Sequence, residues 1–291
     1  MLPRTHELAV PGGVISYCRY GDSAGHPVIA SGGAPGTRWL TPEAAAGFDR
    51  AGIHLLQYDR PGYPGSTRRI GRSVADVADT VRLLADANGW DRFAVLGRSG
   101  AGPYALACAV LLPDRVTRCA VGASLAPPAA DLFQHHDPAW SAGFRVANRG
   151  DAALRPHLRE LGERIMAAAD AGGPEILPEP GVAGPPAPPA PDDPDAMARL
   201  RATFVDGLDG WIDDQIAVIR PWGFDVGTVA VPTALWHGRQ DTRVPYAHGE
   251  WLAARIPGVR FHPHEGGHRA SDAVQRDMFG WLRADQPSPM R

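Results

Sequence analysis

The segment Gly97-Arg98-Ser99-Gly100-Ala101-Gly102 stands between two apolar stretches of the chain. Residues 93–96 predict a short buried strand, and residues 100–112 predict an apolar helix. A serine on so sharp a strand-to-helix turn has a strained backbone, so the residues two before and two after it must be small. Gly97 and Ala101 satisfy this need. The segment predicts Ser99 as an exposed nucleophile, and the alternative is an ordinary glycine-rich turn.

Outward from this segment, signals for strands alternate with signals for helices. Short apolar strands alternating with helices predict a mostly parallel sheet with helices on both of its faces. The sequence therefore predicts an α/β fold class. Strands are predicted at residues 14–20, 27–31, 53–58, 93–96, 117–121, 232–237 and 259–262, and helices at 73–88, 100–112, 246–256 and 271–283.

The alternation stops between residues 127 and 222, where no strand signal is found. Helical patterns at residues 154–171 and 194–219 flank a segment, residues 174–194, with nine prolines in 21 residues. Such a composition favours extended or irregular chain. We expect residues 1–126 and 223–291 to form the α/β core, and residues 127–222 to form an inserted helical cap. The proline-rich segment is interpreted as a surface linker or as the edge of a lid.

Composition excludes several kinds of protein. All 29 basic residues of the 291 are arginine, so lysine-dependent chemistry such as Schiff-base or P-loop phosphate chemistry is excluded. The net charge of −3 gives no reason to expect a nucleic-acid partner. The chain shows no signal peptide and no apolar run of membrane-spanning length, and its three cysteines lack paired spacing. We expect a cytoplasmic protein with no metal, no membrane partner and a small-molecule substrate.

A serine nucleophile needs a base and an orienting carboxylate. His268 follows Glu265-Gly266-Gly267 after the last predicted strand, and Asp241 follows the strand before it. The chain order Ser99, Asp241, His268 is that of one known triad class, and it is neither the chymotrypsin nor the subtilisin order. Since parallel strands end at one edge of a sheet, the three side chains are expected to converge there. The alternative for the histidine alone is an ordinary surface side chain. The alternative for the aspartate alone is a turn residue or a helix cap.

A fourth element is the turn Ser31-Gly32-Gly33-Ala34-Pro35-Gly36 after the second predicted strand. Its glycines would let the main chain approach a substrate closely. A backbone N–H from this turn and that of Gly100 are expected to stabilise an oxyanion. The alternative is a plain β-turn.

These pieces together resemble the α/β-hydrolase-fold serine hydrolases, the group that includes esterases, lactonases and proline-iminopeptidase-like enzymes. Besides the serine segment, the glycine turn resembles the motif H-G-x-P-G, with Gly32 in the histidine position. The other matches are Asp59-Arg60-Pro61-Gly62-Tyr63-Pro64-Gly65-Ser66, Trp236-His237-Gly238-Arg239-Gln240-Asp241 and Gly266-Gly267-His268.

The resemblance implies a nucleophile, acid and base at Ser99, Asp241 and His268, and oxyanion donors at Ala34 and Gly100. It also implies a helical cap after the sixth strand, and no cofactor. The expected activity is hydrolysis of a small carboxylic ester, lactone or thioester through an acyl-enzyme. The alternatives are an aminopeptidase of the proline-iminopeptidase type, an acyltransferase or lyase using the same triad, and a non-catalytic binding module. The cap aromatics Phe133, Trp140, Phe144 and Trp211 either wall an apolar pocket or pack the cap's own core.

Overall fold

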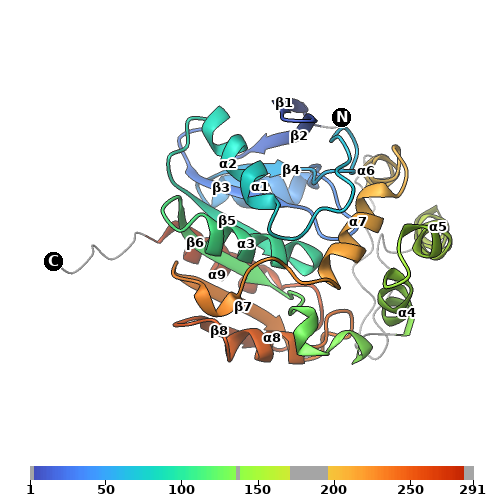
Figure 1. Cartoon of the computed structure of the whole chain (residues 1–291). Coiled ribbons are helices and arrows are strands. Elements are labelled where there is room, and N and C mark those ends of the chain that lie inside the picture. Colours follow the sequence, from blue (N-terminus) through green and yellow to red (C-terminus); the bar gives the residue numbers. More distant parts are fainter. Residues whose placement is uncertain (1–2, 136–137, 171–195, 285–291) are drawn as a thin grey trace.

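The computed structural model describes residues 3–135, 138–170 and 196–284. They contain one eight-stranded sheet with the order β1-β2-β4-β3-β5-β6-β7-β8 (Figure 1). β2 is antiparallel to both β1 and β4, and all other neighbours are parallel. The strands are β1 (His6–Val10), β2 (Gly13–Tyr20), β3 (His26–Ser31), β4 (Ile53–Tyr58), β5 (Phe93–Arg98), β6 (Val116–Gly122), β7 (Thr233–Gly238) and β8 (Arg260–His264).

Helices cover both faces of this sheet. One apolar cluster joins the sheet to α2, α3 and α8, and a second cluster on the other face joins it to α1 and α9. The central strands are buried on both faces, which explains their nearly continuous apolar sequences. The helices are α1 (Pro42–Arg50), α2 (Val77–Ala87), α3 (Gly102–Leu111), α4 (Pro138–Ala147), α5 (Asp151–Asp170), α6 (Ala196–Thr203), α7 (Asp209–Val218), α8 (Tyr246–Ala253) and α9 (Asp272–Arg283).

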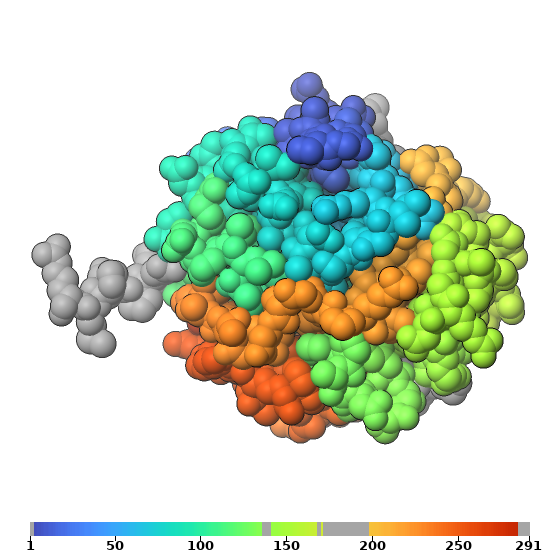
Figure 2. All heavy atoms as spheres, viewed as in Figure 1, coloured from blue at the N-terminus to red at the C-terminus, as the bar shows by residue number. Residues whose placement is uncertain are grey.

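Within the described residues, the regular elements between β6 and β7 are all helices. Helices α4, α5 and α7 pack on one another around a separate apolar cluster that includes Leu158 and Trp211. Figure 1 shows α4 and α5 to one side of the sheet, with α7 between them and the core. In Figure 2 residues 145–170 likewise form a lobe at the edge of the molecule. The proline-rich residues 174–194 lie outside the described part of the chain.

Several elements differ from the sequence-based expectation, which contains neither strand β1 nor helix α4. The helix expected over residues 194–219 is two helices, α6 and α7, separated by a turn in which Gly207 has a φ of 93°. Helix α2 begins at Val77 and not at Ser73, because the Asp76 carboxylate accepts from the backbone N–H and hydroxyl of Ser73 in a preceding turn. Helix α1 was not expected, although Thr41 caps it in the way that favours a helix start.

None of the helices that the structure describes has the length and apolar composition needed to cross a membrane.

Candidate active site

Ser99 lies at the junction of β5 and a 3-10 turn, Ser99–Ala101, that leads into α3. Its φ is 55°, a left-handed conformation that costs a non-glycine residue about 1–3 kcal/mol. A Cβ on Gly97 would collide with the carbonyl oxygen of Ala101 and would lie 2.8 Å from the Cβ of Ala105. The turn is therefore so tight that only glycine fits two residues before Ser99. Ser99 itself lines a cavity of about 1710 Å³.

Asp241 and His268 follow β7 and β8, and their side chains are in contact. Nδ1 of His268 lies 2.9 Å from Oδ2 of Asp241. The Asp241 carboxylate is fully buried, and its Oδ1 accepts from the backbone N–H groups of Arg243 and Val244 at 3.0 and 2.9 Å. A buried carboxylate so held fixes the imidazole with the proton on Nδ1, which leaves Nε2 of His268 available as a base.

A second histidine, His237, also approaches the Asp241 carboxylate. Its Nε2 donates to the carbonyl oxygen of Val244 at 2.8 Å and lies 3.4 Å from Oδ2 of Asp241. Burial by itself raises the pKa of Asp241, but the hydrogen bonds from His237 and His268 outweigh burial and hold that pKa below its ordinary value. Asp241 is therefore ionised at neutral pH.

The loops that carry Asp241 and His268 are bound to each other. The backbone N–H of Gln240 donates to Gly266 at 3.0 Å, and that of Arg239 donates to His264 at 2.9 Å. A Cβ on Gly238 would collide with the carbonyl oxygens of Gly266 and Gly267. Gly238 thus permits a close backbone contact between the loop that carries Asp241 and the loop that carries His268.

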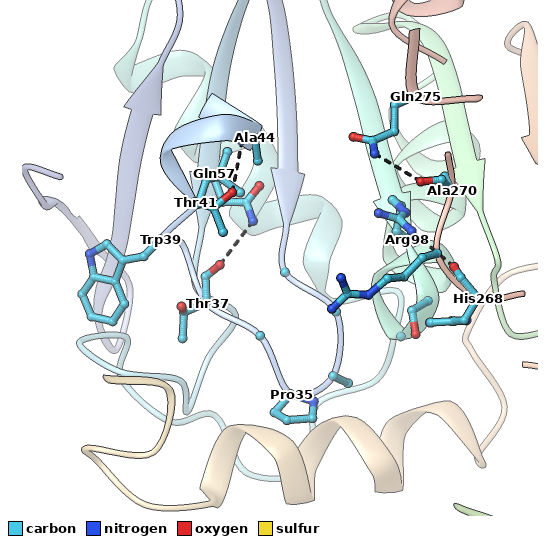
Figure 3. A pocket seen from close by; sticks show the side chains of 18 of the residues that line it. Pro35, Thr37, Trp39, Thr41, Ala44, Gln57, Arg98, His268, Ala270 and Gln275 are labelled. Atoms are coloured by element: carbon cyan, nitrogen blue, oxygen red, sulfur yellow. Dashed lines mark hydrogen bonds between the residues drawn. The ribbon is translucent and has the colours of Figure 1, made fainter. Parts of the chain in front are cut away.

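Ser99 and His268 line the same cavity. In Figure 3, His268 and Arg98 lie on one wall, while Thr37 and Trp39 lie on the opposite wall. The Arg98 guanidinium donates to the backbone carbonyl of His268 at 3.3 Å, so the residue before Ser99 holds the histidine loop. The structure therefore brings the predicted nucleophile, acid and base to one edge of the sheet.

The glycine turn after β3 packs against the start of the 3-10 turn at Ser99. An added Cβ on Gly100 would lie 2.6 Å from the Cβ of Ala34 and 3.2 Å from its backbone nitrogen. The first N–H groups of a helical turn have no partner within that turn. The backbone N–H groups of Ala34 and Gly100, both predicted as oxyanion donors, are therefore close together beside Ser99.

The same turn explains the glycine at position 32. An added Cβ there would lie 2.6 Å from the carbonyl carbon of Gly36 and 2.8 Å from the nitrogen of Thr37. The turn thus folds back on itself so tightly that a histidine side chain would not fit. Another side chain, Arg60, braces the turn instead. Its guanidinium donates to the carbonyl oxygens of Gly32 and Gly33 at 2.5 and 2.7 Å.

Arg60 is bound on its other side by Asp214, which lies on α7. The guanidinium meets both carboxylate oxygens at 2.5–3.1 Å, and both side chains are buried. The carboxylate also accepts from Arg72 at 2.6 Å, Tyr104 at 2.7 Å and Tyr63 at 2.8 Å. Burial alone raises the pKa of Asp214, but Arg60 and Arg72 outweigh burial and lower that pKa to about 2. One ionised carboxylate on α7 thus holds four side chains of the core.

The cap aromatics divide between two environments. Phe144 is buried and lines the cavity, and Phe133 packs against it with ring centroids 4.7 Å apart. Trp211 is 1% exposed and packs within the apolar cluster of α4, α5 and α7. The side chain of Trp140 lies outside the described residues. One of the four aromatics therefore walls the cavity and another packs the helical cluster itself.

Comparison with known proteins supports the architecture. The family model described as the alpha/beta hydrolase fold matches residues 26–167. A hydrolase from Pseudomonas aeruginosa PA01 superposes with a TM-score of 0.65 at 20% identity, over 96% of this chain and 97% of that one. This chain has the α/β-hydrolase fold.

Other α/β-hydrolase-fold structures with similar coverage differ in the chemistry that their names state. An esterase from Rhodococcus sp. ECU1013 matches with a TM-score of 0.66 at 18% identity, covering 97% of this chain and all (100%) of that one. A haloalkane dehalogenase from Bradyrhizobium elkani USDA94 matches with a TM-score of 0.68 at 17% identity, covering 96% and 97%. At such identities the likeness shows the fold, and the reaction has to be argued from the site.

Sequence reasoning missed the cluster around Asp214. Arg60 lies in a motif that supports only the family resemblance, and Asp214 lies in a stretch whose pattern predicts only a helix. A signal is present, because Asp213 and Asp214 lie between the apolar residues Trp211 and Ile212 on one side and Ile216, Ala217 and Val218 on the other. Charged residues are almost never fully buried unless they are paired. An aspartate among the apolar residues of a helix therefore predicts a buried arginine as its partner.

Proposed function

We propose that this α/β-hydrolase-fold protein is a serine hydrolase that cleaves a carboxylic ester. The observation that carries the proposal is the shared cavity of Ser99 and His268, with the His268 imidazole bound to buried Asp241 at 2.9 Å. A hydroxyl becomes a nucleophile when a correctly oriented base removes its proton. The left-handed backbone of Ser99 and the adjacent N–H groups of Ala34 and Gly100 support the same function.

The proposed reaction has two steps. Oγ of Ser99 attacks the ester carbonyl while Nε2 of His268 takes its proton, and Asp241 stabilises the imidazolium that forms. The negative oxygen lies at the N–H groups of Ala34 and Gly100. The ester bond breaks, the alcohol leaves with the proton from His268, and Ser99 remains acylated. A water that gives its proton to His268 then cleaves the acyl-enzyme, releasing the acid and free Ser99.

The serine nucleophile argues against two related activities. Haloalkane dehalogenases and epoxide hydrolases with this fold use an aspartate as nucleophile, and serine stands in that position here. An aminopeptidase has to bind a substrate ammonium group, for which the cavity offers Glu43, Asp214 and Asp272. Asp214 is already bound by two arginines and two tyrosines.

Acyl transfer to an alcohol uses the same acyl-enzyme. Added methanol would divert product to the methyl ester in proportion to such activity.

Turnover of a graded series of p-nitrophenyl esters, with lactones and a proline naphthylamide beside them, tests the proposal. We expect hydrolysis of at least one ester, and a loss in kcat of about 10³-fold or more in both Ser99→Ala and His268→Ala. Rapid hydrolysis of the naphthylamide with no ester turnover would favour the aminopeptidase. Unchanged ester turnover in Ser99→Ala would contradict the proposed nucleophile.

A further inference from the structure

Among the described residues that line the cavity containing Ser99, positive side chains outnumber negative ones. The acidic ones are Glu43, Asp214 and Asp272, and Asp214 is neutralised by Arg60 and Arg72, which are not in the cavity lining. The basic ones are seven arginines, namely Arg50, Arg98, Arg199, Arg243, Arg269, Arg276 and Arg283. For a protein with net charge −3, this is a local concentration of positive charge.

Several of these arginines lack a carboxylate partner within the described part of the chain. Ion pairs hold many of the other arginines, such as Arg68 with Asp213, but none involves Arg50, Arg98, Arg269, Arg276 or Arg283. Burial and the like charge of Arg269 lower the pKa of Arg98, and together they outweigh the Asp241 carboxylate, which raises it. Unpaired like charges that face one cleft repel each other, and a bound anion would relieve that repulsion.

The arginines follow α9 from the base, at the carboxyl edge of the sheet, toward the opposite edge, where the Arg283 guanidinium lies beside Gly52, the residue before β4. Arg269 follows His268 directly, and Arg276 and Arg283 lie on α9 seven residues apart. That spacing places them on the same helix face, about 10 Å apart along the axis. Helix α1 lies beside this face, because an added Cβ on Gly47 would lie 3.7 Å from the ring of Phe279 on α9 and 3.9 Å from the Arg50 guanidinium. Figure 3 shows Arg98, His268, Ala270 and Gln275 along the inner part of this wall.

We infer that the substrate is anionic, an ester or thioester whose chain carries a carboxylate or phosphate group beyond the reacting carbonyl. The inference rests on the proposed hydrolase function. The arginines and Ser99 line one continuous cavity, so a substrate long enough to extend along α9 would reach both. The guanidinium fork matches carboxylate and phosphate oxygens in pairs. The anion would bind at the part of the cavity formed by Arg269, Arg276 and Arg283, here called the arginine wall, while the carbonyl lies at Ser99.

Matched substrates test the inference and distinguish its two sources of negative charge. For a carboxylate, the p-nitrophenyl monoester of dodecanedioic acid, long enough to extend along α9, is compared with the p-nitrophenyl ester of dodecanoic acid, which has similar length and no charge. For a phosphate, acetyl-coenzyme A is compared with S-acetyl-N-acetylcysteamine, which retains the thioester and lacks the phosphates. In one of the two pairs, we expect kcat/KM for the charged substrate to exceed that for its neutral partner by about tenfold or more at low salt. We expect this ratio to decrease at high salt.

Variants locate the effect. The double variant Arg276→Gln/Arg283→Gln should remove most of the preference for the charged substrate, and kcat/KM for its neutral partner should stay within about twofold. Arg255→Gln is the matched control, because Arg255 lies on α8's C-terminal side, stacked over Trp251 and away from the cavity. Equal kcat/KM for charged and neutral substrates, or a preference that the double variant leaves intact, would overturn the inference.

A binding measurement separates this inference from the proposed function. In Ser99→Ala, which cannot form an acyl-enzyme, dodecanedioate and coenzyme A are titrated by calorimetry. We expect one of them to bind, and its dissociation constant to rise about tenfold in the background of the double variant. No binding of either anion would overturn the anionic-substrate inference even if neutral esters are hydrolysed. Binding without any Ser99-dependent turnover would instead contradict the hydrolase function and leave the arginine wall as an anion site.

Discussion

Arg60 and Asp214 form a buried ion pair that connects helix α7 to the glycine turn beside Ser99. One side of the Arg60 guanidinium meets the Asp214 carboxylate, and the other donates to the carbonyl oxygens of Gly32 and Gly33. α7 belongs to the helical segment between β6 and β7, whereas the glycine turn belongs to the sheet edge. The position of the helical segment is therefore coupled directly to the backbone proposed to bind the oxyanion.

Removing the charge of Asp214 should damage both stability and catalysis. Asp214→Asn leaves the positive charges of Arg60 and Arg72 buried without compensation, at a cost of about 3–5 kcal/mol in the free energy of unfolding.

The Arg60→Lys variant keeps a positive charge beside Asp214, but its single ammonium group cannot reach the carbonyl oxygens of both Gly32 and Gly33. We therefore expect kcat to fall while KM changes little. Urea unfolding and ester kinetics measure the two effects. Arg69→Gln, at an exposed ion pair with Asp76, is the control, expected to shift neither by much.

The ion pair also predicts how stability depends on pH. The pKa of Asp214 is about 2 in the folded protein against an ordinary 3.8. A group whose folded pKa is lowered contributes stability above its unfolded pKa and loses it as pH falls toward the folded value. As pH is lowered from about 4 to about 2, the free energy of unfolding should therefore decrease. This decrease should be smaller in the Asp214→Asn variant. Equal pH dependence in the two proteins would show that Asp214 is not a source of the acid sensitivity.

A single methyl group should disturb the proposed oxyanion site. Gly100→Ala places a Cβ 2.6 Å from the Cβ of Ala34, so the glycine turn must move away from Ser99. Loss of one oxyanion donor typically lowers kcat by about 10²–10³-fold. Gly162→Ala on α5 is the control, since its Cβ would meet neighbours at an ordinary 3.8–3.9 Å. A Gly100→Ala protein with wild-type kcat would mean that the turn beside Ala34 takes no part in catalysis.

Asp241→Asn should leave the fold intact and remove most activity. The amide can still contact Nδ1 of His268 but favours the tautomer that carries the proton on Nε2, where the base must be free. We expect kcat to fall by about 10⁴-fold with a small change in KM. Thr242→Val, adjacent in sequence, is a control for local packing. Retention of more than about a tenth of wild-type kcat in Asp241→Asn would indicate that a different group orients the base.

Much of the sheet and of the site was predictable because both follow from local pattern. The central strands are largely apolar and are followed by turns that contain glycine, so their order along the chain and the residues after their ends could be predicted. Ser99 and Asp241 follow two such strands, and His268 follows the edge strand β8. Parallel pairing then brings them to one edge without any further information.

The remainder depends on contacts distant in sequence. Arg60 and Asp214 are 154 residues apart, and nothing near either residue specifies the other. The same holds for Gly32, whose role depends on how closely Gly36 returns to it. The arginine wall likewise needs the tertiary structure, because Arg50 and Arg276 meet one cavity from two helices at opposite ends of the chain.

The most direct test of the account is covalent labelling of Ser99. The folded protein is treated with a fluorophosphonate, which reacts with activated serine hydroxyls, and the adduct is located by peptide mass spectrometry. We predict one adduct, on the peptide that contains Ser99, with no labelling of Ser99→Ala and much slower labelling of His268→Ala. An unlabelled wild-type protein, or an adduct that persists in Ser99→Ala, would contradict the assignment of Ser99 as the nucleophile.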